Sequence, residues 1–341
     1  MLNTVIGSLS STLASPASSS VIAVAHTTSP FISTYPWSAG FGTKYANPAT
    51  LPAGNTKGII FNKAKDTIAV TGDTSPFVNV YPFASGFGTK YANAADLPDG
   101  SSEDVDWNNN DTAIAVVNEV GAQYLEAWPW SAGFGTKYTG PVTQPPGATY
   151  TVEFNPAGTS IAVGHDTSPF ISAYPFSAGF GTKYANPATL PGGVGQAITF
   201  NSTGDTVALG NGVATFITVY AFNAATGFGS KYADPASLPP GGGTGVAFNY
   251  DNTVLALSSS TTPFIVAYPW SAGFGTKYSN PATLPAAAAF GVAWNKNGAD
   301  IAVAHNTSPF ITVYPWSAGF GTKYANPATL PTGNGKAVTF N

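Results

Sequence analysis

Apolar and polar residues alternate along this chain in short segments that are separated by turn residues. In residues 151–155, Val152 and Phe154 alternate with polar positions, and the three residues Pro-Ala-Gly that follow are typical of a turn. Alternation over so few residues predicts a β-strand with one buried face. Turns rich in Ser, Pro and Gly separate three further strands of the same unit, at residues 160–165, 170–176 and 182–185. No segment has a sustained helical period, so the pattern predicts an all-β chain built from four-stranded units.

The unit recurs seven times, and two markers give the same spacing. Each third strand is followed by a copy of the tile, a stretch close to YPWSAGFGTKY, whose lysines are 46, 47, 46, 48, 46 and 46 residues apart. Each first strand ends in an aromatic residue followed by Asn, at Phe61-Asn62, Trp107-Asn108, Phe154-Asn155, Phe200-Asn201, Phe248-Asn249, Trp294-Asn295 and Phe340-Asn341. A strand-rich period of about 40 to 50 residues is typical of a β-propeller blade.

Both ends of the repeated part fall inside a unit. It begins with a second strand at residues 21–26, and the chain stops just after a first strand at residues 337–341. These fragments complement each other in one sheet, whereas an open solenoid needs capping segments. We therefore predict a seven-bladed β-propeller of four-stranded antiparallel blades, closed by the C-terminal strand joining the N-terminal blade. Residues 18–341 are assigned to this single domain, and residues 1–17 to an unrepeated N-terminal arm.

The unit VEFNPAGTSIAVGHDTSPFISAYPF resembles the WD40 pattern, and the likeness covers about 320 residues. It lacks the Gly-His pair before the first strand and has Tyr-Pro-Trp or Tyr-Pro-Phe in place of the Trp-Asp pair. The resemblance implies the propeller fold but not the WD40 hydrogen-bond network. The near-identical copies of TSPFI(S/T)xYPWSAGFGTKYANPATLP are also similar to propeller-repeat proteins encoded by tailed bacteriophages. That likeness implies a protein made in the host cytoplasm and located in the virion.

Composition narrows the range of partners. Only 8% of the residues are charged, with 12 Lys, no Arg and 16 acidic residues, for a formal net charge of −4. A basic face that could displace counterions from phosphates cannot be assembled, so nucleic acid is not an expected partner. The absence of Cys excludes disulfides and thiol nucleophiles. The N-terminal segment lacks the basic region and continuous apolar stretch of a signal peptide, and no run is long enough to span a membrane.

The copied residues are interpreted as structural. A β-branched residue stands two positions before every repeat aromatic, as Val152 does before Phe154, and we expect both to pack against a neighbouring blade. The Asn after the aromatic can hold the following turn through its side chain. The tile sequence AGFGTK lacks the spacing of a phosphate-binding loop and precedes a strand rather than a helix. Its glycines are therefore assigned to a tight turn.

Candidate catalytic and metal-binding residues are few. His26, His165 and His305 occupy one repeat position on separate blades, so we expect them to support turns rather than bind one metal ion. No unit combines a His, a carboxylate and a nucleophile as a triad. An acidic group breaks the symmetry in the third unit, and it is interpreted as a solvated loop, with a Ca²⁺ site as the alternative: Asp96, Asp99, Glu103, Asp104, Asp106 and Asp111. No enzymatic activity, cofactor or metal ion is expected, although Asp106 and Glu153 could face an axial channel.

These features favour a rigid, non-enzymatic platform for protein interaction, in particular a structural or decoration component of a tailed-phage virion that docks onto other virion proteins or onto itself. The N-terminal arm could lie in a partner groove through Leu2, Val5, Ile6, Leu9 and Leu13. The alternative is a lectin-type propeller that binds glycans at repeated sites between blades and would serve adhesion to a host surface. The aromatic residues proposed to stack on sugars in that case are Tyr35, Trp37, Trp130, Trp270 and Trp316.

Overall fold

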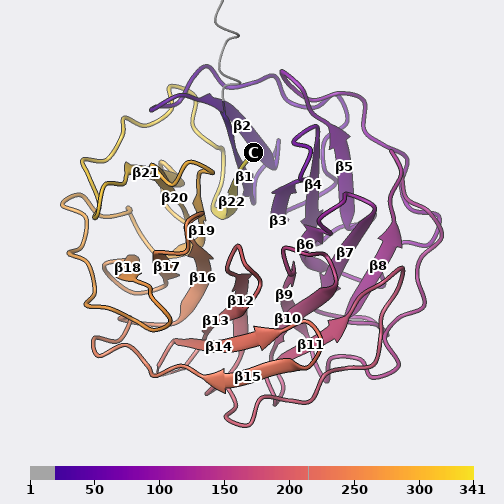
Figure 1. Cartoon of the computed structure of the whole chain (residues 1–341). Helices are drawn as coiled ribbons and strands as arrows, with labels where there is room; N and C mark the ends of the chain where they lie inside the picture. Colours follow the sequence, from indigo (N-terminus) through magenta and orange to yellow (C-terminus); the bar gives the residue numbers. More distant parts are fainter. Residues whose placement is uncertain (1–19, 214) are drawn as a thin grey trace, which may run out of the picture.

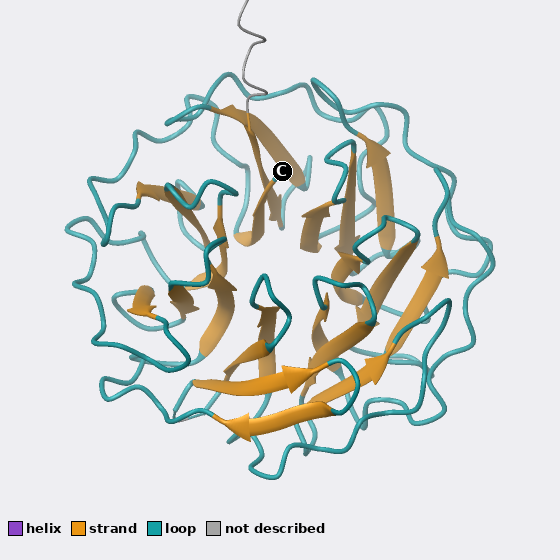
Figure 2. Ribbon diagram, viewed as in Figure 1, coloured by secondary structure: helices purple, strands orange, loops and turns teal. Residues whose placement is uncertain are grey.

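The computed structural model describes residues 20–213 and 215–341, and all regular structure in them is β-strand (Figure 2). The strands form seven antiparallel sheets arranged around a common centre (Figure 1). Within these residues no helix could cross a membrane. The predicted N-terminal arm, including Leu2, Val5, Ile6, Leu9 and Leu13, lies outside the described residues.

The sheets are numbered along the chain. Sheet 1 consists of β1 (Ser20–His26), β2 (Ile32–Trp37) and β22 (Gly335–Phe340). Sheet 2 consists of β3 (Thr56–Phe61), β4 (Thr67–Gly72) and β5 (Val78–Pro82), and sheet 3 of β6 (Ser102–Trp107), β7 (Ala113–Asn118) and β8 (Leu125–Pro129). Sheet 4 consists of β9 (Thr149–Phe154), β10 (Ser160–His165) and β11 (Ile171–Pro175). Sheet 5 consists of β12 (Gly195–Phe200), β13 (Thr206–Asn211), β14 (Ile217–Asn223) and β15 (Gly227–Lys231). Sheet 6 consists of β16 (Gly243–Phe248), β17 (Val254–Ser259) and β18 (Ile265–Pro269), and sheet 7 of β19 (Ala289–Trp294), β20 (Asp300–His305) and β21 (Ile311–Pro315).

The two ends of the described chain share sheet 1. Strand β22 pairs antiparallel with β1, with Val338 opposite Val24. Beyond the strand, Asn341 N donates to Val21 O over 3.0 Å, and Val21 N donates to Asn341 Oδ1 over 2.8 Å. The C-terminus lies within sheet 1, between the labels of β2 and β1 (Figure 1). The predicted joining of the C-terminal strand to the first sheet is therefore confirmed.

Seven hydrophobic clusters hold the sheets together, and each cluster contains residues from two neighbouring sheets. One of them joins the last sheet to the first, with Ala302 and Ile311 of sheet 7 packing with Val24 and Trp37 of sheet 1. An open row of seven sheets would have only six such interfaces. The β-branched and aromatic residues of the first strands lie in these clusters as predicted, as Val152 and Phe154 do between sheets 3 and 4.

The prediction of four strands in every sheet is wrong, because six of the seven sheets have three. In sheet 4, residues 182–185 form no strand, and only Phe176 and Phe180 form a β-bridge. The third strand contains Pro175, whose carbonyl accepts a bond from Gly181 N over 2.8 Å. The N–H and C=O of one strand residue face the same edge, so the N–H that Pro175 lacks would also face the outer edge of the sheet. The hydrogen-bond ladder to a fourth strand is therefore interrupted at the proline. Sheet 5 has Ala221 at this position and a longer following turn, and it alone among the described sheets gains the fourth strand β15.

Candidate binding pockets between neighbouring sheets

Two pockets occupy the same place in the repeat, each between a pair of neighbouring sheets. The 6/7 pocket has a volume of about 300 Å³ and is lined by Asn249, Tyr250, Asp251, Thr253, Val254, Tyr278, Asn297, Gly298, Trp316 and Ala318. The 3/4 pocket has a volume of about 400 Å³ and is lined by Asn108, Asn110, Thr112, Ala113, Tyr138, Ala157, Gly158, Thr159, Phe176, Ser177 and Ala178. Both are formed by the turn after the first strand of each sheet, the Tyr after the tile lysine and the aromatic residue of the next tile.

The repeat Asn shapes the turn that forms one wall of the 6/7 pocket. Asn249 Oδ1 accepts a bond from Val254 N over 2.8 Å, and its Nδ2 donates to Thr253 Oγ1 over 3.1 Å. The Asn side chain thus satisfies backbone and hydroxyl groups four and five residues further on. The predicted role of this Asn in holding the turn is confirmed, although its partners lie further along the chain than in a simple Asx turn.

Aromatic rings form the opposite wall. The rings of Tyr278 and Trp316 meet edge to face, with centroids 5.0 Å apart and planes at 86°. Trp294 and Phe320 hold the Trp316 ring in similar contacts, at 5.0 and 4.9 Å. Trp316 and Tyr278 remain partly exposed, whereas Tyr250 at the edge of the pocket is 67% exposed. The pocket therefore presents a fixed corner of two rings and a third ring that is free in solvent.

A carboxylate supplies the charge of the 6/7 pocket. Thr253 donates to Asp251 Oδ1 from its hydroxyl over 2.6 Å and from its backbone N–H over 3.2 Å. The hydroxyl bond from Thr253 lowers the pKa of Asp251 below its ordinary value. The group is therefore ionised at neutral pH and acts only as an acceptor. In the 3/4 pocket, Asn110 stands at the position of Asp251 and Phe176 at that of Trp316.

Four of the five aromatic residues predicted to stack on sugars are buried, so that assignment is wrong for Tyr35, Trp37, Trp130 and Trp270, which are 0%, 3%, 7% and 6% exposed. They lie inside the inter-sheet clusters, where their rings make edge-to-face contacts. Trp37 Nε1 also donates to Asp300 Oδ2 over 2.9 Å. Trp316 alone among the five lines one of the two pockets. Tyr250, Asp251 and Tyr278 were not predicted from the sequence. The two residues after the repeat Asn differ in every unit, so Tyr250-Asp251 gives no distinct signal there.

The three histidines have structural roles, as expected. Each is fully buried at the end of a second strand. His165 Nε2 lies 3.0 Å from Ser172 Oγ, and its Nδ1 lies 2.7 Å from Thr167 O. Burial lowers the pKa of His165 to about 4, so the ring is neutral at physiological pH. Burial has the same effect on the pKa of His26 and His305.

The interpretation of the acidic group as a solvated loop is wrong for Glu103, Asp104 and Asp106, which lie in β6, whereas Asp96, Asp99 and Asp111 do lie in loops or turns. Asp104 and Asp106 belong to β6, where they accept bonds from backbone N–H groups of β9 in the next sheet: Val152 N to Asp104 at 3.1 Å and Phe154 N to Asp106 at 2.7 Å. Inner strands have an edge without a ladder partner, and these carboxylates satisfy its donors. In the described part of the chain, no group of three His, Cys, Asp or Glu residues could hold a metal ion.

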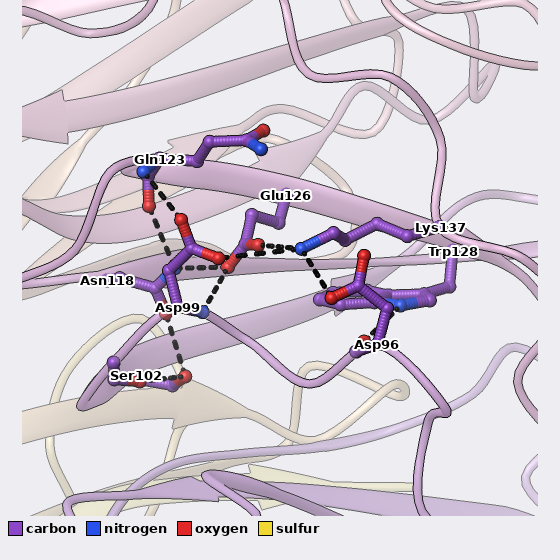
Figure 3. A network of polar contacts seen from close by, with 9 residues as sticks. Asp96, Asp99, Ser102, Asn118, Gln123, Glu126, Trp128 and Lys137 are labelled. Carbon is purple, nitrogen blue, oxygen red and sulfur yellow. Dashed lines mark hydrogen bonds and ion pairs between the residues drawn. The ribbon is translucent and has the colours of Figure 1, made fainter.

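Asp96 and Asp99 join a second polar network in sheet 3 (Figure 3). Lys137 Nζ lies 2.7 Å from Glu126, 3.2 Å from Asp96 and 3.5 Å from Asp99, and the Glu126 side chain is fully buried. Glu126 also accepts bonds from Asp99 N and Asn118 Nδ2. Burial raises the pKa of Glu126, although Lys137 acts in the opposite direction.

The tile lysine of sheet 3 is placed differently from its counterparts. In the other six tiles the lysine donates to an Asn or Asp three residues later, at Asn47, Asn93, Asn186, Asp234, Asn280 and Asn326. Gly140 occupies that position in sheet 3, and Lys137 turns to Glu126 instead. Gly140 thus removes the usual partner of the tile lysine, and Glu126 replaces it.

Charged residues on the inner strands cluster in sheets 2 to 4. Lys57 in β3 pairs with Glu103 in β6, and Asp106 lies near Glu153 in β9. Burial raises the pKa of Glu153 well above its ordinary value, and the neighbouring Asp106 raises it further. Burial likewise raises the pKa of Asp104 to about 7. Perturbed carboxyls can mark a functional site, but here Asp104 and Asp106 are occupied by backbone bonds between sheets.

Comparison with known proteins identifies the fold only. No protein-family model matches the chain, and no curated protein matches its sequence. The chain is similar in structure to a candidate 6-phosphogluconolactonase from Bacteroides uniformis, with a TM-score of 0.68 and 13% identity over 95% of this chain and 100% of that one. A candidate 6-phosphogluconolactonase from Bacteroides fragilis gives a TM-score of 0.69 at 13% identity over 96% and 99%. The β-propeller domain of Cps50 (Swd1) from Myceliophteria thermophila gives 0.61 at 10% identity over 84% and 90%. These likenesses show that the chain has a β-propeller fold.

Proposed function

We propose that this protein is a non-enzymatic, carbohydrate-binding propeller that recognises sugars in pockets between neighbouring sheets. The observation that carries the proposal is that the 6/7 and 3/4 pockets occupy equivalent places and combine the same elements, an aromatic ring, a Tyr and several Asn and Thr side chains. Pyranose rings have a face of C–H groups and a rim of hydroxyls, which match an aromatic wall and a polar wall. Several weak sites on one rigid body would add through avidity.

The test is binding of the full chain to an array of neutral and acidic glycans, followed by saturation-transfer NMR with the saccharides that bind. We expect binding that weakens when the exposed pocket residue Tyr250 is replaced by Ala. A folded protein that binds no saccharide on the array, and gives no saturation transfer from any at millimolar concentration, would refute the proposal.

The charged residues of this chain do not favour the enzymatic function that the names of the two Bacteroides neighbours suggest. A phosphorylated sugar acid needs cationic side chains, and this chain contains no Arg. The inner strands carry two lysines, Lys57 and Lys336, against four carboxyl residues, Glu103, Asp104, Asp106 and Glu153. Lys57 is in addition paired with Glu103 and Glu119. An assay for lactone hydrolysis that gave activity abolished by Glu153→Gln would reverse this conclusion.

A protein-docking role in a tailed-phage virion is the second candidate, and exposed leucines on the loops that connect the sheets favour it. Six loops carry a Leu at one repeat position, partly or largely exposed in each: Leu51, Leu97, Leu190, Leu238, Leu284 and Leu330. Evenly spaced apolar side chains could meet a symmetric partner surface. Mass spectrometry of purified phage particles tests this role, since a virion component must be present in them in fixed proportion to the known structural proteins.

A further inference from the structure

The 6/7 pocket differs from the 3/4 pocket at several lining or adjoining positions, and three of these changes alter its aromatic surface or its charge. Tyr250, Asp251 and Trp316 correspond to Asn109, Asn110 and Phe176. The first two changes are exposed and support no packing between sheets, since Tyr250 is 67% exposed and Asp251 lies beside it on the same turn. Surface changes without a packing role are candidates for ligand contact.

The aromatic changes enlarge the apolar contact surface of the pocket. The Trp316 and Tyr278 rings form a corner that their neighbours hold rigidly. Tyr250 adds an exposed ring at the edge of the same pocket. A ligand with a flat C–H face can therefore contact more than one ring, and little conformational entropy is lost because the two inner rings are already fixed.

Asp251 gives the same pocket a negative charge with one oxygen available. Both bonds from Thr253 go to Oδ1. No lysine forms an ion pair with this carboxylate in the described residues. Lys277 donates to Asn280 over 3.1 Å instead, and none of the ion pairs within residues 20–213 and 215–341 includes Asp251. Oδ2 can therefore accept a hydroxyl or an ammonium, whereas a ligand carboxylate meets an uncompensated like charge.

We propose that the 6/7 pocket is a selective subsite for a neutral or amino-substituted pyranose and that Asp251 excludes uronic and sialic acids from it. This assignment rests on the proposed function. By contrast, the 3/4 pocket has the neutral Asn110 at the same position and does not discriminate by charge.

The test compares neutral glycosides with the matching uronides, such as methyl glucoside with methyl glucuronide and methyl galactoside with methyl galacturonide, by saturation-transfer NMR at several concentrations. Repulsion between two like unit charges about 4 Å apart in water lowers the affinity roughly fivefold relative to an uncharged ligand. The wild-type 6/7 pocket should therefore prefer each neutral sugar by at least that factor. Asp251→Asn should remove the preference, and Asn110→Asp should introduce it at the 3/4 pocket.

Tyr250→Ala separates stacking from charge without risk to the fold, because the side chain is largely exposed. We expect it to weaken neutral-sugar binding about two- to tenfold while leaving the ratio of neutral to acidic affinity unchanged. Asn109→Ala, the equivalent change at the other pocket, should leave the affinity of the 6/7 pocket unaltered. If sugars bind but Asp251→Asn leaves the ratio as it was, the charge assignment is overturned and the proposed function stands. If no glycoside binds, the proposed function itself fails.

Discussion

The ion pair between Lys137 and Glu126 gives the sharpest test of how sheet 3 is stabilised. Lys137 is the closest cation to a carboxylate that is fully buried, with Nζ and Oε1 separated by 2.7 Å. Replacing Lys137 by Met leaves that carboxylate with hydrogen bonds from Asp99 N and Asn118 only. Removal of one partner of a buried pair costs about 3 to 5 kcal/mol of unfolding free energy. We expect Lys137→Met to fall in this range at pH 7.

The matched control is Lys277→Met, the same substitution in the tile of sheet 6. Lys277 donates to the side chain of Asn280 at the surface, so its loss should change the unfolding free energy by no more than about 0.5 kcal/mol. Both variants are measured by urea denaturation, with the slope of the transition compared as a check that the unfolded state is unchanged.

A double-mutant cycle then identifies the cause. Glu126→Gln keeps an acceptor for Asn118 and removes the charge, so Lys137→Met combined with Glu126→Gln should recover most of the stability lost in the single Lys variant. The loss in Lys137→Met should also shrink at pH 5, because the unpaired carboxyl can then bind a proton. If Lys137→Met costs no more than Lys277→Met, the pair does not stabilise the sheet and the reasoning is refuted.

Three further predictions follow from the same structure. His165 has a pKa of about 4 in the folded protein and an ordinary value of 6.5, so the unfolded chain binds a proton first and stability is lost as the pH falls below 6.5. His165→Asn should reduce the loss of stability between pH 7 and pH 5 by about 2 kcal/mol, measured by urea titration at each pH. An unchanged pH dependence would contradict this. Glu153 has a raised pKa, so the stability of the fold falls as the pH rises and this buried group must ionise. Glu153→Gln should therefore raise the urea midpoint at pH 8 but not at pH 4. Equal shifts at the two pH values would exclude a buried charge as the cause. Ala221→Pro should remove the outer ladder of β15, seen as faster amide exchange in residues 227–231 with little change in β13, whereas retained protection would show that the longer turn alone makes the fourth strand.

Much of the fold could be predicted because the determinants are local and repeated. Val152 and Phe154 alternate with polar residues in a strand, and the structure buries both between sheets. The offset between the chain ends predicted the pairing of β22 with β1, since complementary fragments have one shared solution. The prediction of a fourth strand was wrong because the third strand ends in a proline. The missing N–H of that proline faces the outer edge, where a fourth strand would pair.

The candidate site was harder to predict because its walls come from distant parts of the chain. Tyr250, Tyr278 and Trp316 belong to three separate segments of two sheets, and only their packing brings them to one pocket. The acidic group illustrates the same limit. The partner of Asp106 is a backbone N–H 48 residues away in the next sheet, which the local density of carboxylates does not reveal. The exposure that the glycan-binding alternative required of the tile aromatics failed likewise, since repetition shows that a residue is needed but not which of its faces is covered.

The positions where the copies differ separate into two kinds. Gly140 and Glu126 depart from the repeat together, and Glu126 gives Lys137 a partner inside the sheet where the turn has lost its usual Asn or Asp. Asp300 likewise receives bonds from Trp37 and Tyr324 at the interface between sheets 7 and 1. Tyr250, by contrast, is exposed and stands at a turn position whose residue varies from unit to unit. Because this ring adds nothing to the core, its removal tests the proposed pocket without disturbing the packing between sheets.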